Sequence, residues 1–501
     1  MVIRILVSAA TVLALSAVPV CAALTISASA TVNVTCSGGV CMATAKKANL
    51  SATDLQTMLA SGNVNVVAGN KAKDIAVKTS FDWSSTNRLS LDSFRGIAVR
   101  ASVMVLGAGS VTLTTNDGGS GGLLQFEGKG SISFLDTTSD LTINGAAYVL
   151  AADFATLSDG IAKNPGGNFA WARSYDAGPD GVYTQNPVTS ILAGRFEGLG
   201  NTIMNLSIDN ADRGVHVGMF YEVAVAADLH LVKARVKAKG TNVSVGVLAG
   251  ACGGVSGVTV SGSVTGAAGS FVGGVCGDLS GDMSGTNSSG TVSGKGDTTS
   301  ARNGLGGLVG FLDGGTLSNS SSSAKVIGST GWTAGGLVGE TENSIYRITN
   351  TFATGLVSVG DEGTAGGLVG NNAGLHAIDN SYATGFVIGG VNSSVGGFIG
   401  INNGPVSDSY SSGAVASGSG NAVGGFIGAD LGAADLTDTY WDTTTSGQSH
   451  GVGNNTSYPG ITGLTTEQFQ AGLPAGFDSR VWAEDPNING GLPYLLAVPP
   501  K

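Results

Sequence analysis

The strongest constraint on this fold is a five-residue phrase that returns about once every thirty residues. It reads Gly-Gly-Leu-Val-Gly three times and Gly-Gly-Phe-Ile-Gly twice, and looser copies begin at Gly218, Gly246 and Gly273. The first glycines of successive copies are 27 to 33 residues apart. A near-fixed period of this length indicates one structural unit stacked on itself, so we expect a solenoid. The glycines of the five full copies are Gly306, Gly307, Gly310, Gly335, Gly336, Gly339, Gly366, Gly367, Gly370, Gly396, Gly397, Gly400, Gly424, Gly425 and Gly428.

Two further positions repeat downstream of the glycines. In a parallel solenoid, equivalent residues of successive coils lie about 4.8 Å apart. At that distance Asn side chains can bond to one another and aromatic rings can stack. The glycine pairs have two open explanations, a backbone conformation closed to other residues or a close approach between coils. The polar position holds Asn319, Asn350, Asn380, Asp408 and Asp438. The aromatic position holds Phe352, Tyr382, Tyr410 and Tyr440.

Short β-branched runs separated by Gly, Asn, Asp and Ser fill the chain from Asn63 to Leu150. They suit coils of a parallel β-helix, although an antiparallel sandwich gives the same cue. Two short helices are expected, one between Ser51 and Gly62 and one over Asp153–Asn164. The stretch Pro165–Pro187 is rich in Gly, Asp and Pro and is expected to be irregular. The predicted fold is therefore all-β, a right-handed parallel β-helix from about residue 50 to 440 with small irregular caps.

The start of the chain predicts export. Arg4 precedes the apolar run Ile5–Val20, and small residues follow it, as in a signal peptide cleaved near Ala22 or Ala23. No later stretch is apolar enough for a membrane-spanning helix, so we expect a secreted or outer-membrane-associated protein. The expected parts are a signal peptide (1–23), an N-terminal hairpin and helix cap (24–62), a β-helical region with an irregular excursion (63–195), a repeat β-helix (196–440) and a C-terminal cap (441–501).

Charge limits the expected chemistry. Only 12% of residues are charged and the net charge is −11, so we expect neither nucleic acid nor anionic lipid as a partner. Asp408 and Asp438 are interpreted as Asn substitutes in the ladder rather than a catalytic pair. The aromatic position is interpreted as a buried or edge stack rather than an exposed platform for sugars. We expect no catalytic residue, no cofactor and no metal site. We expect the four histidines and three of the glutamates to be solvated loop residues: His216, His230, His376, His450, Glu340, Glu342 and Glu362.

Four cysteines follow the predicted leader. Cys36 and Cys41 flank a Ser-Gly-Gly-Val turn between two alternating strands, which predicts a disulfide across a hairpin. Cys252 and Cys276 fall at different positions of their repeats. Cys276 replaces the Val or Ile of other copies and is interpreted as a buried thiol, with a second disulfide left open.

The repeats resemble the GLUG repeat of large bacterial exoproteins of the filamentous haemagglutinin-like class. Both halves of the motif recur in order over Gly306–Tyr440, and the Tyr440-Trp441-Asp442 ending is similar to that of such proteins. The resemblance implies an exported, non-enzymatic adhesin-like or surface-scaffold protein. An unknown surface glycan or protein would be its ligand, and an outer-membrane transporter is a candidate partner. The alternative is a carbohydrate-active β-helix enzyme, a polysaccharide lyase or hydrolase.

Overall fold

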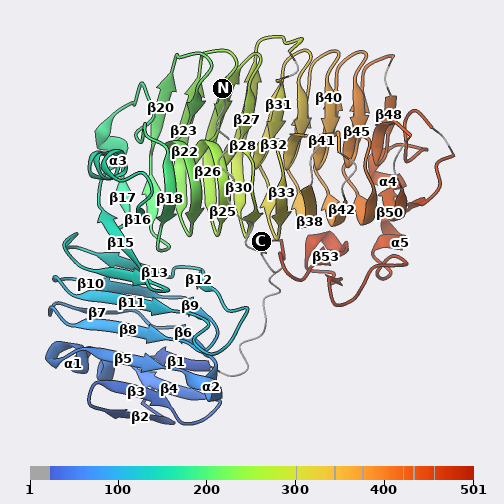
Figure 1. The fold of residues 1–501 in the computed structure, drawn as a ribbon. Helices are drawn as coiled ribbons and strands as arrows, with labels where there is room; N and C mark the ends of the chain where they lie inside the picture. Colours follow the sequence, from blue (N-terminus) through green and yellow to red (C-terminus); the bar gives the residue numbers. More distant parts are fainter. Residues whose placement is uncertain are drawn as a thin grey trace.

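The computed structural model describes residues 23–300, 302–342, 346–374, 377–420, 422–432, 435–455 and 457–500. The predicted signal peptide and His376 therefore lie outside the described residues, except that Ala23 opens the first strand. The chain is mostly strand and forms a β-solenoid of about 15 turns (Figure 1). The prediction of an all-β parallel β-helix is confirmed. In the described part of the chain, no helix has the length and apolar character needed to cross a membrane.

The first segment is built from three parallel sheets, and each of its complete coils contributes one strand to each sheet. In Figure 1 these strands, blue to cyan, run across the direction of the later ones. The first sheet contains β4 (Ala48–Ser51), β1 (Ala23–Ser27), β6 (Asp74–Val77), β9 (Ile97–Val99) and β12 (Leu124–Phe126). The second contains β7 (Phe81–Trp83), β10 (Ser102–Val105) and β13 (Ser131–Phe134). The third contains β3 (Val40–Ala43), β5 (Val64–Val67), β8 (Arg88–Asp92), β11 (Ser110–Thr114) and β14 (Leu141–Ile143).

The repeat segment is a stack of coils in which each strand pairs in parallel with its equivalent in the next coil. The short strands that end at the first glycine of the motif, or one residue before it, form one row: β21 (His216–Val217), β24 (Ser244–Val245), β27 (Phe271–Gly273), β31 (Gly304–Gly306), β36 (Thr333–Gly335), β40 (Thr364–Gly366), β44 (Ser394–Gly396) and β48 (Ala422–Gly424). The strands after the glycines form the next row: β22 (Phe220–Ala227), β25 (Ala249–Ser256), β28 (Cys276–Leu279), β32 (Val309–Leu312), β37 (Val338–Thr341), β41 (Val369–Asn372), β45 (Ile399–Asn402) and β49 (Ile427–Asp430).

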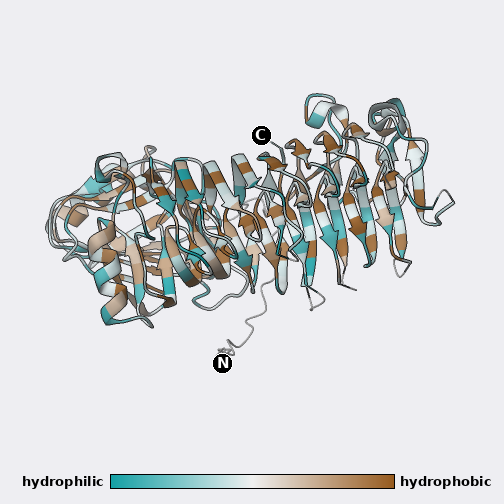
Figure 2. Cartoon of the chain, turned by 90° about the horizontal axis from the view of Figure 1, so that it is seen from above, coloured by the Kyte–Doolittle hydropathy of each residue, from teal (hydrophilic) through white to brown (hydrophobic). Residues whose placement is uncertain are grey.

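The remaining two sides of the coil carry the downstream motif. One side contains β29 (Met283–Ser284), β33 (Gly315–Ser318), β34 (Ser321–Ser322), β38 (Tyr346–Ala353), β42 (Ile378–Ala383), β46 (Val406–Ser411) and β50 (Leu436–Asp442). The other contains β20 (Ser207–Asn210), β35 (Lys325–Gly328), β39 (Val357–Ser358), β43 (Val387–Gly389) and β47 (Val415–Ser417). Three long strands span both sides: β23 (His230–Ala238), β26 (Thr259–Ala267) and β30 (Asn287–Lys295). Hydrophilic and hydrophobic residues alternate along many strands (Figure 2), as expected for a sheet with one buried face.

Both predicted helices are present. α1 (Ala52–Ser61) begins after Ser51, whose side chain accepts from the backbone N–H of Asp54, and it ends before Gly62. α3 (Phe154–Lys163) begins after Asp153 in the same way. The shorter helices are α2 (Gly69–Ala72), α4 (Thr443–Ser446) and α5 (Thr466–Phe469).

The predicted limits of the β-helix were too narrow. β1, assigned to an N-terminal hairpin, pairs in parallel with β4 and β6, while the antiparallel hairpin is β2 (Val34–Ser37) with β3. The supposedly irregular stretch Pro165–Pro187 contains β16 (Asn168–Trp171) and β17 (Tyr175–Asp176), which pair with β18 (Leu192–Glu197) and β19 (Thr202–Met204). β51 (Ile461–Leu464) extends the stack beyond residue 440. A preceding coil offers an open strand edge, so even segments rich in turn residues can add to it.

The motif glycines are explained by close approach. None of them has a positive φ. A Cβ atom at Gly367 would lie 2.1 Å from the carbonyl oxygen of Gly397 in the next coil and 2.9 Å from Cβ of Ala383 across the interior. A Cβ at Gly366 would lie 1.9 Å from the oxygen of Val369. Both apolar residues after each glycine pair are buried, because the chain turns a corner between them, as at Leu368 and Val369.

Gly367→Ala is therefore expected to destabilise the array by about 1–3 kcal/mol, the usual cost of overpacking. Gly166→Ala is the matched control, since Gly166 has no positive φ and nothing lies within 4 Å of its added Cβ. Denaturant melts followed by far-UV circular dichroism would compare the two variants. Equal midpoints would contradict the close-approach explanation.

Candidate functional site

The Asn/Asp ladder is a row of corners with left-handed backbone. Asn319, Asn350, Asn380, Asp408 and Asp438 all have φ between 46° and 51°. Strand pairing extends the same row back to Asp228, Gly257 and Gly285, which also have positive φ. Asn, Asp and Gly are the residues that adopt this conformation most readily. The row is thus selected for its backbone, because glycine has no side chain with which to join a ladder.

Side-chain bonding along this row, the predicted role, is not what the structure contains. The Oδ1 atoms of Asn319 and Asn350 are buried without a hydrogen-bond partner among the described residues. Asn380 donates to its neighbour Asp379 and accepts from Trp482. Burial raises the pKa of the Asp408 carboxyl, and the negative charge of Asp438 adds to the rise. The two acids are consecutive corner residues.

This explanation predicts a specific mutational pattern. Asn350→Gly is expected to leave stability nearly unchanged, whereas Asn350→Ala should cost about 1–2 kcal/mol, because a left-handed conformation is unfavourable for a residue with a Cβ. A side-chain ladder would instead make both substitutions equally costly. Denaturant midpoints of the two variants separate these cases.

Hydroxyl groups next to the corners make the contacts between coils. From Gly285 onward, the residue after each corner is a buried Ser or Thr, and the serine hydroxyls of this row accept the backbone N–H of the equivalent residue in the preceding coil. Ser381 accepts from Thr351 N at 3.3 Å, and Ser409 accepts from Ser381 N at 3.1 Å. The sequence analysis did not identify this row, although a Thr or Ser at a fixed offset from the corner was a usable signal. The row is Thr286, Ser320, Thr351, Ser381, Ser409 and Thr439.

A second row missed from the sequence is a buried amide ladder. Asn372 donates from Nδ2 to Oδ1 of Asn402 at 2.7 Å, and both side chains are fully buried. Tyr346 donates its hydroxyl to Asn372, and Asp430 follows Asn402 in register. These residues end the strands after the glycines, at a second corner of the coil. Buried amides that are fully bonded fix the register of a stack.

The aromatic row is buried beneath the C-terminal segment. Phe352, Tyr382 and Tyr410 stack at centroid distances of 4.8 and 5.2 Å with nearly parallel rings. They form one hydrophobic cluster with Phe469, Phe477, Trp482 and Leu495 of the C-terminal segment, residues 465–498. In the preceding coils, which this segment does not cover, the same register holds His230, Thr259, Asn287 and Ser321. At this position Phe and Tyr therefore occur in the coils over which the chain folds back (Figure 1).

Polar contacts fix the C-terminal segment in place. The hydroxyl of Tyr410 donates to the carbonyl oxygen of Pro493 at 2.7 Å, and that of Tyr440 donates to Ala475 O at 2.7 Å. Trp482 Nε1 donates to Asn380 Oδ1 at 3.1 Å. Near the end of the stack, the Trp441 ring fills the interior position held by Ser411 in the coil before, and β51 adds one further strand beyond it. The segment thus caps one face of the last coils.

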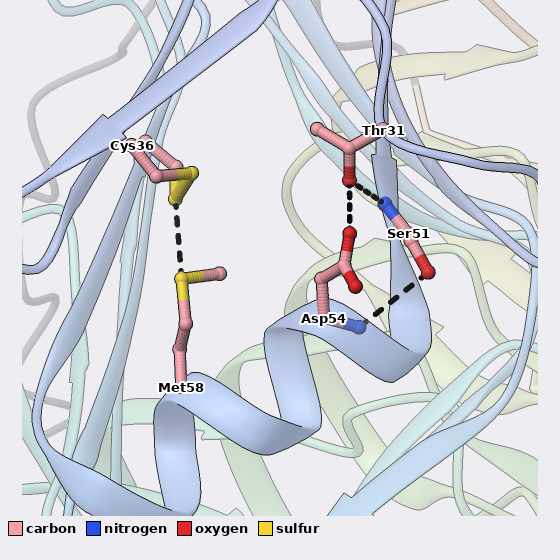
Figure 3. Close-up of a disulfide and its surroundings, with 6 residues drawn as sticks. Thr31, Cys36, Ser51, Asp54 and Met58 are labelled. Atoms are coloured by element: carbon pink, nitrogen blue, oxygen red, sulfur yellow. Dashed lines mark hydrogen bonds between the residues drawn. A yellow bond between two sulfur atoms is a disulfide. The ribbon is translucent and has the colours of Figure 1, made fainter.

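Both cysteine pairs form disulfides. Cys36 and Cys41 are opposite each other in the β2–β3 hairpin with Cα atoms 4.1 Å apart, and Cys41 Sγ lies 3.7 Å from Met58 Sδ of α1 (Figure 3). Thr31 connects to the same helix by donating to Asp54 (Figure 3). Cys252 and Cys276 are bridged in the interior with Cα atoms 6.1 Å apart, so the interpretation of Cys276 as a free thiol was wrong. In-register stacking is not required at that distance.

A row of carboxyl groups lies along the strands after the glycines. Glu222, Asp278 and Glu340 share one register, with Ala251 and Phe311 between them. Burial raises the pKa of Asp278 to about 6 and that of Glu340 to about 7. Glu340 accepts from the Thr333 side chain and is only 9% exposed, so its prediction as a solvated loop charge was wrong. Its place in a strand was not evident from the sequence, because the run Glu-Thr-Glu after Gly339 is polar and resembles a loop.

Arg302 lies against this row. Its guanidinium is 4.3 Å from the centroid of the Phe271 ring, and Nη2 donates to Ser244 Oγ at 3.0 Å. The rings of Phe271 and Phe311 stack at 4.4 Å. Arg302 partly offsets the burial that raises the pKa of Asp278 and Glu340. Polar side chains thus meet between the row of short strands and the row of strands after the glycines, and the stacked rings of Phe271 and Phe311 pack beside them.

The histidines and the other two glutamates named from the sequence are dispersed over the fold. His216 and His230 are half-buried strand residues rather than loop residues, and burial lowers the pKa of His216, which packs against Tyr221. His450, Glu342 and Glu362 are exposed. No three metal-ligating side chains converge anywhere in the described ranges.

One concentration of charge was missed because only the net charge was considered. β23 and the residue after it present Lys233, Arg235, Lys237 and Lys239 at alternate positions, with buried alanine and valine between them. The alternation Lys-x-Arg-x-Lys-x-Lys was the signal. This basic strand is defined by those four residues.

Comparison with known proteins finds only distant structural similarity. No family model matches the chain, and no curated protein matches it. Among solved structures, the chain is similar to a crystal structure from Bacteroides ovatus described as a putative immunoglobulin A1 protease. The similarity covers 70% of this chain and 92% of that chain, with 18% identity and a TM-score of 0.39. A similarity this low carries no argument about activity.

Proposed function

We propose that the protein is an exported, non-enzymatic surface protein that acts as an adhesin-like rod or scaffold. The observation that supports this most is the stack of equivalent outward rows on successive coils, which a ligand can contact at several places at once. Repeated weak contacts on one rigid body give strong attachment through avidity. The resemblance to GLUG-repeat, filamentous haemagglutinin-like exoproteins points the same way and belongs to this proposal.

The disulfides support an extracellular setting. Disulfides persist in oxidising compartments, and both cysteine pairs are bridged. Buried hydroxyl and amide rows connect coil to coil, so the stack keeps its shape without a partner. The ligand would be a surface glycan or protein, and an outer-membrane transporter would deliver the chain to the surface.

Adhesion can be tested with protein-coated beads applied to a glycan array and to immobilised matrix proteins. Retention of the beads at concentrations where the soluble protein binds weakly is the expected result, because coating multiplies the contacts. Absence of retention on all surfaces would contradict the proposal.

The enzyme alternative would have to use the carboxyl row, because Asp278 and Glu340 have raised pKa values and Arg302 lies beside them. Raised carboxyl pKa values suit general acids. Release of reducing or unsaturated ends from acidic polysaccharides, abolished in Asp278→Asn, would replace the adhesin proposal by an enzymatic one.

A further inference from the structure

The basic strand carries charge that its fold does not require. In the two following coils, the positions in register with Arg235 are Ser263 and Thr291, and those in register with Lys237 are Thr265 and Ser293. Those coils have the same strand pairing with hydroxyl side chains. Like charges that lie close together on one face of a strand repel one another. Arg235 and Lys237 therefore have no structural role that Ser and Thr could not fill.

The charge is only partly offset within the protein: the Asp209 carboxylate faces Lys237 and interacts with Lys239 and Arg235 as well, and that of Asp176 interacts with Lys233. Lys239 pairs with Asp209 of β20 at 2.8 Å. Among the described residues, Lys233, Arg235 and Lys237 form no ion pair. The side chains of Lys233, Arg235 and Lys239 are exposed and that of Lys237 is half-buried. Lys325, in register with Arg235 three coils later, and Lys295, at the end of β30, extend the cationic face along the stack.

The geometry fits an extended polymer. Alternate residues of a strand are about 6.7 Å apart, so the row presents evenly spaced cations on a flat surface. Lys233 lies at a corner with φ of 55°, and the others follow it along the strand. Beside the row, the hydroxyls of Ser207, Ser263 and Thr265 can donate to or accept from a hydroxylated chain.

We propose that the basic strand and its hydroxyl neighbours bind a linear anionic polysaccharide, one that carries carboxylate or sulfate groups along the chain. This names the ligand class of the proposed adhesin and rests on that function. Nucleic acid is the weaker candidate, because the chain has a net charge of −11 and because single-strand sites combine cations with aromatic platforms for bases. The outward neighbours on β20, β26 and β30 in the described structure are Ser, Thr, Asn, Ala, Lys and Asp.

The test uses polygalacturonate as the carboxylate probe and dextran sulfate as the sulfate probe, with neutral dextran and duplex DNA alongside. Arg235→Ser with Lys237→Thr reproduces the residues of the next coil, so the double variant should fold as the parent does. Lys46→Ser with Lys47→Ser is the matched control, since it removes two exposed cations that are far from the basic strand in the sequence. Circular dichroism melts confirm that both variants are folded.

The full-length protein should bind at least one of the two anionic polysaccharides, more weakly as salt rises, and should not bind dextran. The Arg235/Lys237 variant should lose on the order of tenfold in affinity, about 1.4 kcal/mol, while the control changes little. Equal losses in the two variants, equal binding to dextran, or tighter binding to duplex DNA would overturn the inference. If protein-coated beads adhere to surfaces while neither polyanion binds, this inference fails alone. If the beads do not adhere at all, the proposed function fails.

Discussion

Replacing Trp482 by alanine is expected to release the C-terminal segment from the solenoid while the coils remain folded. The Trp482 side chain is 1% exposed and stacks on Phe477 at 4.5 Å. Its ring centroid is 6.0 Å from those of both Tyr382 and Tyr410. Truncation of a buried Trp typically costs 3–5 kcal/mol, so the attachment of a short segment should be largely lost, by about that amount.

The coils should survive because each one contacts mainly its neighbours in a repeat array. Limited proteolysis is the measurement: Trp482→Ala should be cut rapidly near residue 465, while far-UV circular dichroism stays close to that of the parent. Trp482→Phe keeps a ring but loses the bond to Asn380, and it should cost about 1 kcal/mol. Leu496→Ala, at a side chain that is 45% exposed, is the control. Unchanged proteolysis of Trp482→Ala, or collapse of the whole array, would contradict the expectation.

The architecture was predictable because in a solenoid the residues that touch are those at the same position of the repeat. Gly335 pairs with Gly366, and Tyr382 pairs with Tyr410, as their spacing in the sequence indicates. The period therefore contains the register directly. The two helices were predictable for a different reason, because capping depends on residues only a few positions apart.

The causes of the patterns were harder to predict. A row of Asn and Asp is compatible with bonded side chains and with a left-handed backbone, and only the φ angles distinguish them. The glycines at positions 257 and 285 were a signal for the second explanation, but their register with Asn319 is clear only once the strands are paired.

The cover over the aromatic row could not be derived from the repeat. Trp482 and Asn380 are 102 residues apart, and the C-terminal segment has no period that places it. The change in the aromatic register from Ser321 to Phe352 did indicate that the environment changes between those coils. The carboxyl row was missed for a related reason, since the burial of Glu340 depends on the packing of a strand row from another part of the coil.

Glu340→Gln is expected to stabilise the protein at neutral and alkaline pH but not at acid pH. Burial raises the pKa of Glu340 from an ordinary 4.5 to about 7, and the Thr333 hydrogen bond only partly opposes this. The folded state therefore holds a proton that the unfolded state releases. The resulting stability is fully present below about pH 4.5 and is lost as the pH rises through about 7. A shift of this size corresponds to roughly 3 kcal/mol.

Gln has the size of the protonated acid and can still accept from Thr333, so it removes the titration without removing the contact. Guanidinium midpoints measured from pH 5 to pH 8 should fall more steeply for the parent than for Glu340→Gln. Asp278, with its pKa near 6, and Glu197, with its pKa near 7, give the parent further slope of the same sign, which the variant retains. Glu362→Gln, at an exposed side chain, should follow the parent at every pH. Identical profiles for the parent and Glu340→Gln would mean that Glu340 is ionised in the folded protein with water or Arg302 as its partner.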